Sequence, residues 1–216
     1  AAALAATALL GAPAHAQDKV TIGFLTDMST VYADLDGKLG ATAIQMAIDD
    51  FGGKVNGKPI QLLQADNLNK ADVALAKGRE WFDTQQMDML VGGTNSAAAL
   101  ALAKLAQEKK KPFIVNGSGS SALTNEQCNP YTIHYAWDSV ALAKGTAAAL
   151  TKQGAKNWFL LVADYAFGHA MQADAAKVID ANGGKLVGVA RHPINLSDYS
   201  SFLLQAQNSK PQVLGF

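Results

Sequence analysis

Residues 89–104 read Met-Leu-Val-Gly-Gly-Thr-Asn-Ser-Ala-Ala-Ala-Leu-Ala-Leu-Ala-Lys, and this stretch decides the fold of the chain. A short apolar run stops at two glycines, a Thr-Asn-Ser trio follows, and a helix-prone segment then begins. This order predicts a strand, a turn and a helix. In an open α/β sheet such a turn lies at the carboxyl end of the strand, where ligands bind. The side chain of Asn95 or Ser96 can cap the helix, and the free N–H groups at its start suit a carboxylate.

The same alternation of strand and helix recurs along the chain at about the length of a βαβ unit. Strands are expected at residues 20–25, 60–65, 88–92, 112–116, 158–163 and 185–190. Helices are expected at residues 37–51, 70–86, 95–110, 138–152, 168–181 and from Ser197, a good N-cap residue, onward. In the first of these helices, Leu39, Ala43 and Met46 fall in helical register. Alternation of this kind predicts an α/β fold of parallel sheets with helices on both faces.

The rhythm changes after Gly117. Residues 117–130 are rich in turn formers and leave room for little more than one helical turn, and residues 131–137 look like an extended crossing segment. We therefore expect an N-terminal ligand-binding lobe over residues 17–130, a hinge crossing at 131–137, and a C-terminal lobe over 138–216. The last residues, 212–216, fall in or just beyond a strand, so the second lobe is expected to be incomplete.

Residues 1–16 form a short apolar run that closes on Ala14-His15-Ala16, an A-x-A cleavage signal. The run is shorter than the roughly 18 residues of a membrane-spanning helix, and a Gly and a Pro interrupt it. We interpret it as the remnant of a secretory signal peptide that is cut after Ala16. The alternative is a disordered alanine-rich tail. On the first interpretation the protein is exported.

The charges exclude some partners. Lys and Arg number 18 and Asp and Glu also number 18, so the formal net charge is zero. Such a chain lacks the basic surface that nucleic acid or an anionic membrane requires. The one basic run, Lys109 to Lys111, is typical of a solvated helix C-terminus. Cys128 is the only cysteine, so no disulfide can form within these residues.

Motifs for catalysis and for cofactors are weak. Residues 117–122 match G-x-G-x-x-A after a strand, but Pro130 follows too soon for the helix that a dinucleotide site needs. The four histidines show no metal-ligand spacing, and His134 favours a structural role. No G-x-S-x-G nucleophile elbow is present. We therefore expect no enzyme, no cofactor and no bound metal.

Two loops and one aromatic turn remain as binding elements. The loop 117–120 would lie beside the loop 92–96 and offer small hydroxyls and N–H groups, which together would form a polar cup. Ordinary turns that use Gly and Ser for geometry alone are the alternative. The turn Asp164-Tyr-Ala-Phe-Gly168 follows a strand and presents two rings. Aromatic loop residues suggest a cover over a ligand, and packing at a helix start is the alternative.

In sequence order these segments resemble the periplasmic substrate-binding proteins of the leucine/isoleucine/valine-binding type, which serve ABC importers. The resemblance covers nearly all of residues 19–216, and the order of the motifs is more specific than any one motif. The motifs are the signal peptide, Val-Thr-Ile-Gly-Phe-Leu-Thr-Asp-Met-Ser, the helix ending in Gly-Gly, Leu-Val-Gly-Gly-Thr-Asn-Ser, Pro-Phe-Ile-Val-Asn-Gly-Ser-Gly with Leu123-Thr124, and Asp-Tyr-Ala-Phe-Gly. The resemblance implies the two-lobed type I periplasmic binding protein fold, each lobe a parallel sheet flanked by helices, with the C-terminal part missing from this chain.

The resemblance also implies the site. In that family the turns after the third and fourth strands hold the ligand's carboxylate and amino group, and the second-lobe aromatic closes over the ligand. The residues carried over from the two turns are Thr94, Asn95, Ser96, Gly117, Ser118 and Ser120. The rings carried over are Phe167, Tyr165 and, from the loop after the first strand, Tyr32. Where amino-acid binders often have an Ala-Thr pair, this chain has Ser118-Gly119, so an aromatic carboxylate stays open beside an amino acid.

The function that the resemblance implies is that of a periplasmic solute-binding protein of an ABC importer. It would capture an amino acid (branched-chain or other hydrophobic) or a small aromatic carboxylate by hinge closure and deliver it to the permease subunits. No nucleic-acid partner is expected. Three alternatives are open: a ligand-sensing receptor of the same fold, an α/β enzyme, and a sugar-binding relative.

Overall fold

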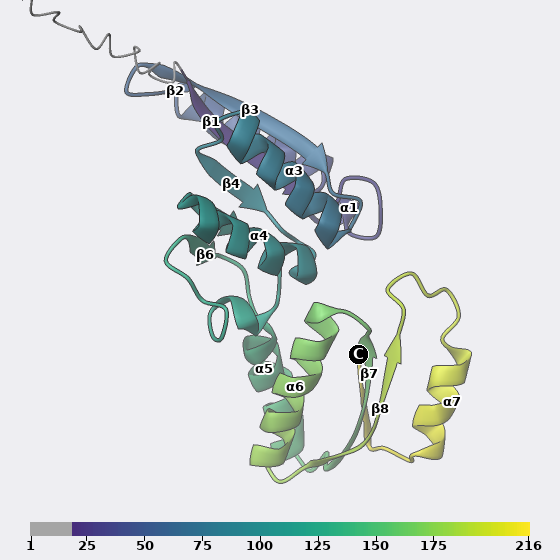
Figure 1. Ribbon diagram of the computed structural model, residues 1–216. Helices are drawn as coiled ribbons and strands as arrows, with labels where there is room; N and C mark the ends of the chain where they lie inside the picture. Colours follow the sequence, from purple (N-terminus) through teal and green to yellow (C-terminus); the bar gives the residue numbers. More distant parts are fainter. Residues whose placement is uncertain (1–18) are drawn as a thin grey trace, which may run out of the picture.

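The computed structural model describes residues 19–216. The expected signal-peptide remnant, residues 1–16, lies outside the described residues. These residues form a six-stranded and a three-stranded sheet, each with its own helices (Figure 1). We call the six-stranded sheet with its helices the first lobe and the three-stranded sheet with its helices the second lobe. Within residues 19–216, no helix is long and apolar enough to cross a membrane.

The sheet of the first lobe has the strand order β2-β3-β1-β4-β5-β6. Every neighbouring pair is parallel except β2 with β3, which form an antiparallel pair. The strands are β1 (Val20–Thr26), β2 (Lys54–Val55), β3 (Lys58–Asp66), β4 (Met89–Gly92), β5 (Phe113–Val115) and β6 (Thr132–His134). The helices are α1 (Ala33–Asp36), α2 (Lys38–Asp50), α3 (Ala71–Thr84), α4 (Ser96–Lys109) and the 3-10 turn η1 (Ser121–Leu123).

The core of the first lobe lies between the sheet and helices α3 and α4. Side chains from alternate positions of the strands meet apolar residues of these helices there. Its buried members include Leu25, Trp81, Leu90, Leu102 and Phe113. Parallel strands connected by helices require such cover, because their side chains are apolar along most of the strand. This core fixes where β1, β4 and β5 end, and therefore where the loops that follow them lie.

The second lobe has the strand order β8-β7-β9, all parallel. Its elements are β7 (Asn157–Ala163), β8 (Lys185–His192), β9 (Val213–Gly215), α5 (Ser139–Lys152), α6 (Ala166–Ala181) and α7 (Ser200–Asn208). Helices α5 and α6 bury Trp158 and Leu160 on one face of the sheet. Helix α7 covers the other face over Phe159 and Leu161. Alternate residues of β7 therefore enter opposite cores, as the period of a strand requires.

The expected strands and helices are present with shifted ends, whereas α1 and β2 were not expected. Helix α6 begins at Ala166, so Phe167 lies in its first turn and not in a loop before the helix. Helix α7 begins at Ser200, so the expected start at Ser197 is wrong. The N-cap residue is Tyr199, which makes no side-chain cap, and the Ser200 N–H donates to the carboxylate of Asp198 at 2.9 Å. Another difference lies in the expected crossing segment, where residues 132–134 form β6 and pair with β5. The lobe boundaries at residues 130 and 138 stay predictions.

Candidate functional site

The two expected ligand loops are neighbours because β4 and β5 pair in parallel and end at the same edge of the sheet. The first loop starts at Gly92, whose φ of +130° is accessible to glycine and strained for other residues. A Cβ atom added at Gly92 would lie 2.2 Å from the carbonyl oxygen of Leu25, so the backbone of β1 passes directly beside this turn. The close approach between β4 and β1 therefore requires a glycine at position 92.

Asn95 caps helix α4. Its Oδ1 accepts a hydrogen bond from the Ala98 N–H at 3.0 Å, and its Nδ2 donates to Oδ1 of Asn69 at 2.6 Å. The side chain is buried. Both polar ends of the Asn95 amide are thus engaged within the first lobe.

Ser96 and Ser118 join the two loops. The Ser118 Oγ donates to the Ser96 Oγ at 2.9 Å, and both residues are fully buried. Ser120 donates its backbone N–H to the Ser118 Oγ at 3.3 Å. The carbonyl oxygen of Ser118 lies 2.6 Å from Nε2 of His134 in β6, so this histidine positions the loop, in line with the structural role expected for it.

Asp36 lies at the same edge, and the sequence analysis missed it. Its carboxylate accepts hydrogen bonds from the Thr26 Oγ at 2.8 Å, the Thr94 Oγ at 2.5 Å and the Asn116 Nδ2 at 3.1 Å. Hydrogen bonds to an ionised acceptor are stronger than those between neutral groups. Three strand ends of the first lobe are therefore held together by one acid. Asp36 ends a helix of four residues, and no sequence period marks it.

Gly117 belongs to this cluster for a steric reason. A Cβ atom added there would lie 2.5 Å from the Thr94 Oγ and 3.1 Å from the Thr94 Cα. The glycine therefore lets the second loop pack against the first.

Tyr32 is positioned by the buried carboxylate of Asp27. This side chain accepts hydrogen bonds from the backbone N–H groups of Ser29, Thr30 and Tyr32 and from the Thr30 hydroxyl. Burial disfavours the charged carboxylate, but the Thr30 hydroxyl and the three N–H groups outweigh it, so the pKa of Asp27 lies below its ordinary value. The charged form thus holds the loop after β1 in a fixed shape with Tyr32 at its end.

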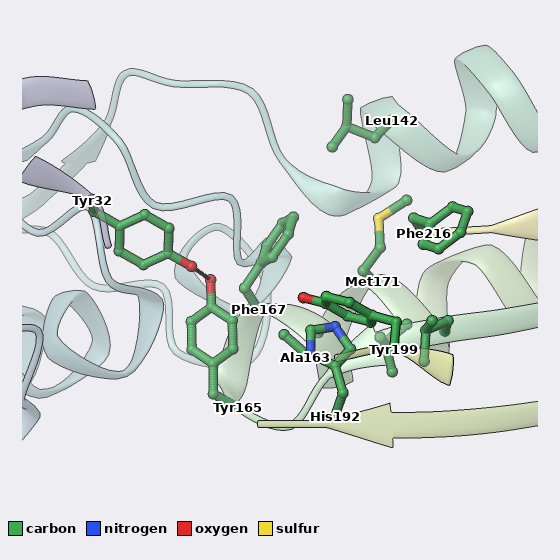
Figure 2. Close-up of a pocket in the computed structure, with 12 residues that line it drawn as sticks. Tyr32, Leu142, Ala163, Tyr165, Phe167, Met171, His192, Tyr199 and Phe216 are labelled. Carbon is green, nitrogen blue, oxygen red and sulfur yellow. Dashed lines mark hydrogen bonds between the residues drawn. The ribbon is translucent and has the colours of Figure 1, made fainter. Parts of the chain in front are cut away.

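Four aromatic rings connect the two lobes. The hydroxyls of Tyr32 and Tyr165 are in hydrogen-bond contact, and their ring centroids are 6.4 Å apart (Figure 2). Phe167 lies 6.2 Å from Tyr165 and 5.8 Å, edge to face, from Trp137. Burial, followed by the hydrogen bond with Tyr32, raises the pKa of the Tyr165 hydroxyl well above its ordinary value, so this group is neutral at physiological pH.

Three of these rings, those of Tyr32, Tyr165 and Phe167, border a cavity of about 440 Å³ at the carboxyl ends of β7 and β8 (Figure 2). The residues that line it are Tyr32, Leu142, Leu161, Val162, Ala163, Tyr165, Phe167, Gly168, Met171, His192, Tyr199 and Phe216. Tyr32, Tyr165 and Phe167 are thus brought together as expected, whereas the six loop residues from Thr94 to Ser120 lie outside this lining. Within residues 19–216, no cluster of acidic, histidine or cysteine side chains could hold a metal ion.

The sequence analysis missed the polar wall of the cavity. His192 ends β8 and Tyr199 precedes α7, and their rings pack edge to face with centroids 5.0 Å apart. His192 also places its Nδ1 2.8 Å from the carbonyl oxygen of Pro193. The available signal was that His192 stands two residues after the predicted strand end at Ala190, at the carboxyl edge where ligands bind.

Comparison with known proteins agrees with this architecture. A family model described as periplasmic binding protein matches residues 19–216. A periplasmic binding protein from Burkholderia mallei is 61% identical, with a TM-score of 0.89, over 91% of this chain and 52% of that one. A branched-chain amino acid ABC transporter periplasmic ligand-binding protein from Burkholderia xenovorans LB400 is 40% identical, with a TM-score of 0.74, over 91% and 52%.

A third structure is more distant. A solute-binding protein of an ABC transporter from Rhodopseudomonas palustris BisB5, in complex with 3,4-dihydroxybenzoic acid, is 27% identical, with a TM-score of 0.81, over 92% of this chain and 54% of that one. The chain spans about half the length of the solved structures that it matches. The family match, the identity to the Burkholderia structures and the shared two-lobed α/β fold show that the chain belongs to the periplasmic binding protein family, with the type I fold.

Proposed function

We propose that this chain is part of a solute-binding protein of an ABC importer, located in the periplasm, which captures a small carboxylate by closing its lobes and delivers it to the permease. Membership of the family supports this proposal, as do similar proteins described as parts of ABC transporters. The observation that carries it is the meeting of Tyr32 from the first lobe with Tyr165 and Phe167 from the second at one cavity. A ligand held there would contact both lobes and favour their closed arrangement.

Among ligands, we propose an aromatic carboxylate first. Rings from both lobes line the cavity, and among its described lining residues none is an acid that could hold an ammonium group. His192 and the Tyr199 hydroxyl would offer hydrogen bonds to a polar substituent on the ligand ring. The similar protein that contains 3,4-dihydroxybenzoic acid supports this choice. An amino acid is the second candidate, because the name of the 40% identical protein specifies branched-chain amino acids.

The part that the polar loops play in ligand contact stays a prediction. Gly117 is the one of the six loop residues that is not buried, so its backbone N–H would be open to a ligand carboxylate. The buried hydroxyls of Ser96 and Ser118 would act by holding that backbone in place.

Thermal unfolding of the full-length mature protein tests the proposal. The probes are benzoate, 4-hydroxybenzoate, L-leucine, L-phenylalanine and glucose. A probe at about one hundred times its Kd should add roughly 2.7 kcal/mol to the free energy of unfolding, which raises Tm by several degrees. Phe167→Ala should lose most of that increase. If folded protein shows no increase with any probe, the proposed function is wrong for these ligand classes, and an increase with glucose alone would favour the sugar-binding alternative.

A further inference from the structure

Three separate segments meet at Gly119. The glycine belongs to the loop after β5 in the first lobe, Trp137 to the connection between β6 and α5, and Phe167 to the first turn of α6 in the second lobe. A Cβ atom added at Gly119 would lie 2.3 Å from the Trp137 ring and 2.7 Å from the Phe167 ring. Both rings therefore rest directly on the backbone of the loop.

Hydrogen bonds hold this junction in place. The Ser139 N–H, two residues after Trp137, donates to the carbonyl oxygen of Gly119 at 2.8 Å. The Ser121 N–H in turn donates to the Ser139 Oγ at 3.3 Å. The Asp174 carboxylate of α6 accepts from both serine hydroxyls at 2.7 Å. The loop, the connection and helix α6 are thus tied together beside the two rings.

Trp137 differs from the other tryptophans of the chain. Its exposed fraction is 53%, whereas Trp81 and Trp158 are 6% and 3% exposed. Trp137 thus belongs to none of the buried core clusters that the described residues form, and its ring contacts Phe167 edge to face. The Phe167 ring thus has two aromatic neighbours, Trp137 edge to face at 5.8 Å and Tyr165 at 6.2 Å.

We propose that Trp137 is a positioning residue for ligand selection: held over Gly119, it fixes the Phe167 ring at the border of the cavity and so limits the site to small, flat ligands. This inference rests on the proposed function, because it assigns a selective role within the same site. Trp137 acts through Phe167, which lines the cavity, and Gly119 is required because any side chain there would push both rings.

Binding by variants of the full-length protein tests the inference. The probes are benzoate, 4-hydroxybenzoate, L-phenylalanine and L-leucine, measured by calorimetry. Trp137→Ala should lower the affinity for the tightest-binding probe about tenfold and reduce the ratio of that affinity to the affinities for the other probes. Trp137→Phe keeps a ring edge against Phe167, so its affinities should stay within about threefold of the wild-type values. The matched control is Tyr135→Ala, which removes an 82% exposed ring two positions away and should change no affinity.

A second variant changes Gly119, on which both rings rest. Gly119 does not have a positive φ, so Gly119→Ala strains no backbone angle and acts through the two rings alone. Gly119→Ala should lower the affinity for the bulkier L-phenylalanine more than the affinity for benzoate. Tryptophan fluorescence offers a direct readout, since Trp137 is the exposed tryptophan. A ligand that reorders the rings should change the tryptophan emission of the wild type and leave that of Trp137→Phe unchanged.

The outcomes separate the two proposals. If the wild type binds a probe and Trp137→Ala keeps the same affinities and the same ranking, the inference is wrong and the proposed function stands. If the wild type binds none of the probes, the proposed function fails for these ligands and the inference fails with it. In either case the Tm losses of Trp137→Ala and Phe167→Ala, singly and together, measure the ring contact, and strictly additive losses would contradict it.

Discussion

The polar loops of the first lobe and the aromatic border of the cavity were expected to form one site, yet they differ in what their side chains contact. Ser96 and Ser118 are fully buried and bonded to each other, and Thr94 donates to Asp36. Tyr165 and Phe167 are partly exposed, and both face a cavity. The side chains of the loops thus stabilise the first lobe, whereas the rings keep exposed surface that a ligand can contact.

The physical reason is the different consequence of burial for the two kinds of side chain. A buried hydroxyl without a partner destabilises the fold by about 1–3 kcal/mol, so small polar residues at packed strand ends pair with one another. An aromatic ring makes no such demand and can cover a cavity or a ligand equally well. Four predictions test this difference, and the largest effect comes first.

Among these variants, Gly92→Ala, at the start of the first polar loop, should destabilise the protein most. The new Cβ would meet the Leu25 carbonyl oxygen at 2.2 Å, and the φ of +130° would be strained as well. We expect a loss of about 3–5 kcal/mol in the free energy of unfolding, measured by urea denaturation. Gly53→Ala is the matched control, because Gly53 also has a positive φ and has nothing within 4 Å of an added Cβ. Equal losses in the two variants would show that the contact with β1 is unimportant.

Asp36→Asn should have the next largest effect. The amide keeps one acceptor oxygen and brings an NH2 group toward donors from Thr26, Thr94 and Asn116. We expect a loss of about 1–3 kcal/mol, seen as a lower urea midpoint with an unchanged m-value. Asp34→Asn is the control, because Asp34 lies on the same short helix and is exposed. An unchanged midpoint for Asp36→Asn would mean that the cluster does not hold the strand ends.

Ser96→Ala should remove the acceptor for the Ser118 hydroxyl and destabilise the protein by about 1 kcal/mol. Ser118→Ala breaks the same hydrogen bond, so the double variant should lose less than the sum of the single variants. Denaturation of all three proteins under one condition measures this coupling. Additive losses would indicate that the two hydroxyls serve separate partners, and would favour direct ligand contact for at least one of them.

Tyr165→Phe should have the smallest effect at neutral pH, about 0.5–1 kcal/mol, because it removes the hydroxyl contact with Tyr32 and keeps the ring. Folding raises the pKa of Tyr165 above the ordinary value of 10.0, so the neutral hydroxyl contributes its full stability below that pH and loses it as the pH rises further. The difference in unfolding free energy between the wild type and Tyr165→Phe should therefore shrink above about pH 10. A difference that grows with pH would contradict burial of the hydroxyl.

Much of the fold was predictable because it depends on local chemistry. The run from Met89 to Lys104 gave a strand at 89–92, a cap at Asn95 and a helix at 96–109. Ser197 failed as a helix start because α7 begins at Ser200, after Tyr199, an N-cap residue with no side-chain cap. Capping propensity marks a possible helix start, but it does not fix the residue at which the helix begins.

Helical register was correct in α2 but did not identify its buried side. Leu39 and Met46 share a register, and they are 76% and 61% exposed. The buried positions of α2 are Ala41 and Ile48. Helix α2 thus has two apolar faces in its sequence, and only the tertiary structure determines which of them is buried.

By itself, the sequence determined the alternation of strands and helices, the glycine turns, and the family to which the chain belongs, since these depend on residues a few positions apart. Only the tertiary structure decided which side chains meet. Asp36 reaches Asn116 across 80 positions, and Tyr32 reaches Tyr165 across 133. Such contacts exist because the parallel strands of each sheet end at a common edge and the two lobes face each other, and no local pattern of residues encodes that distance.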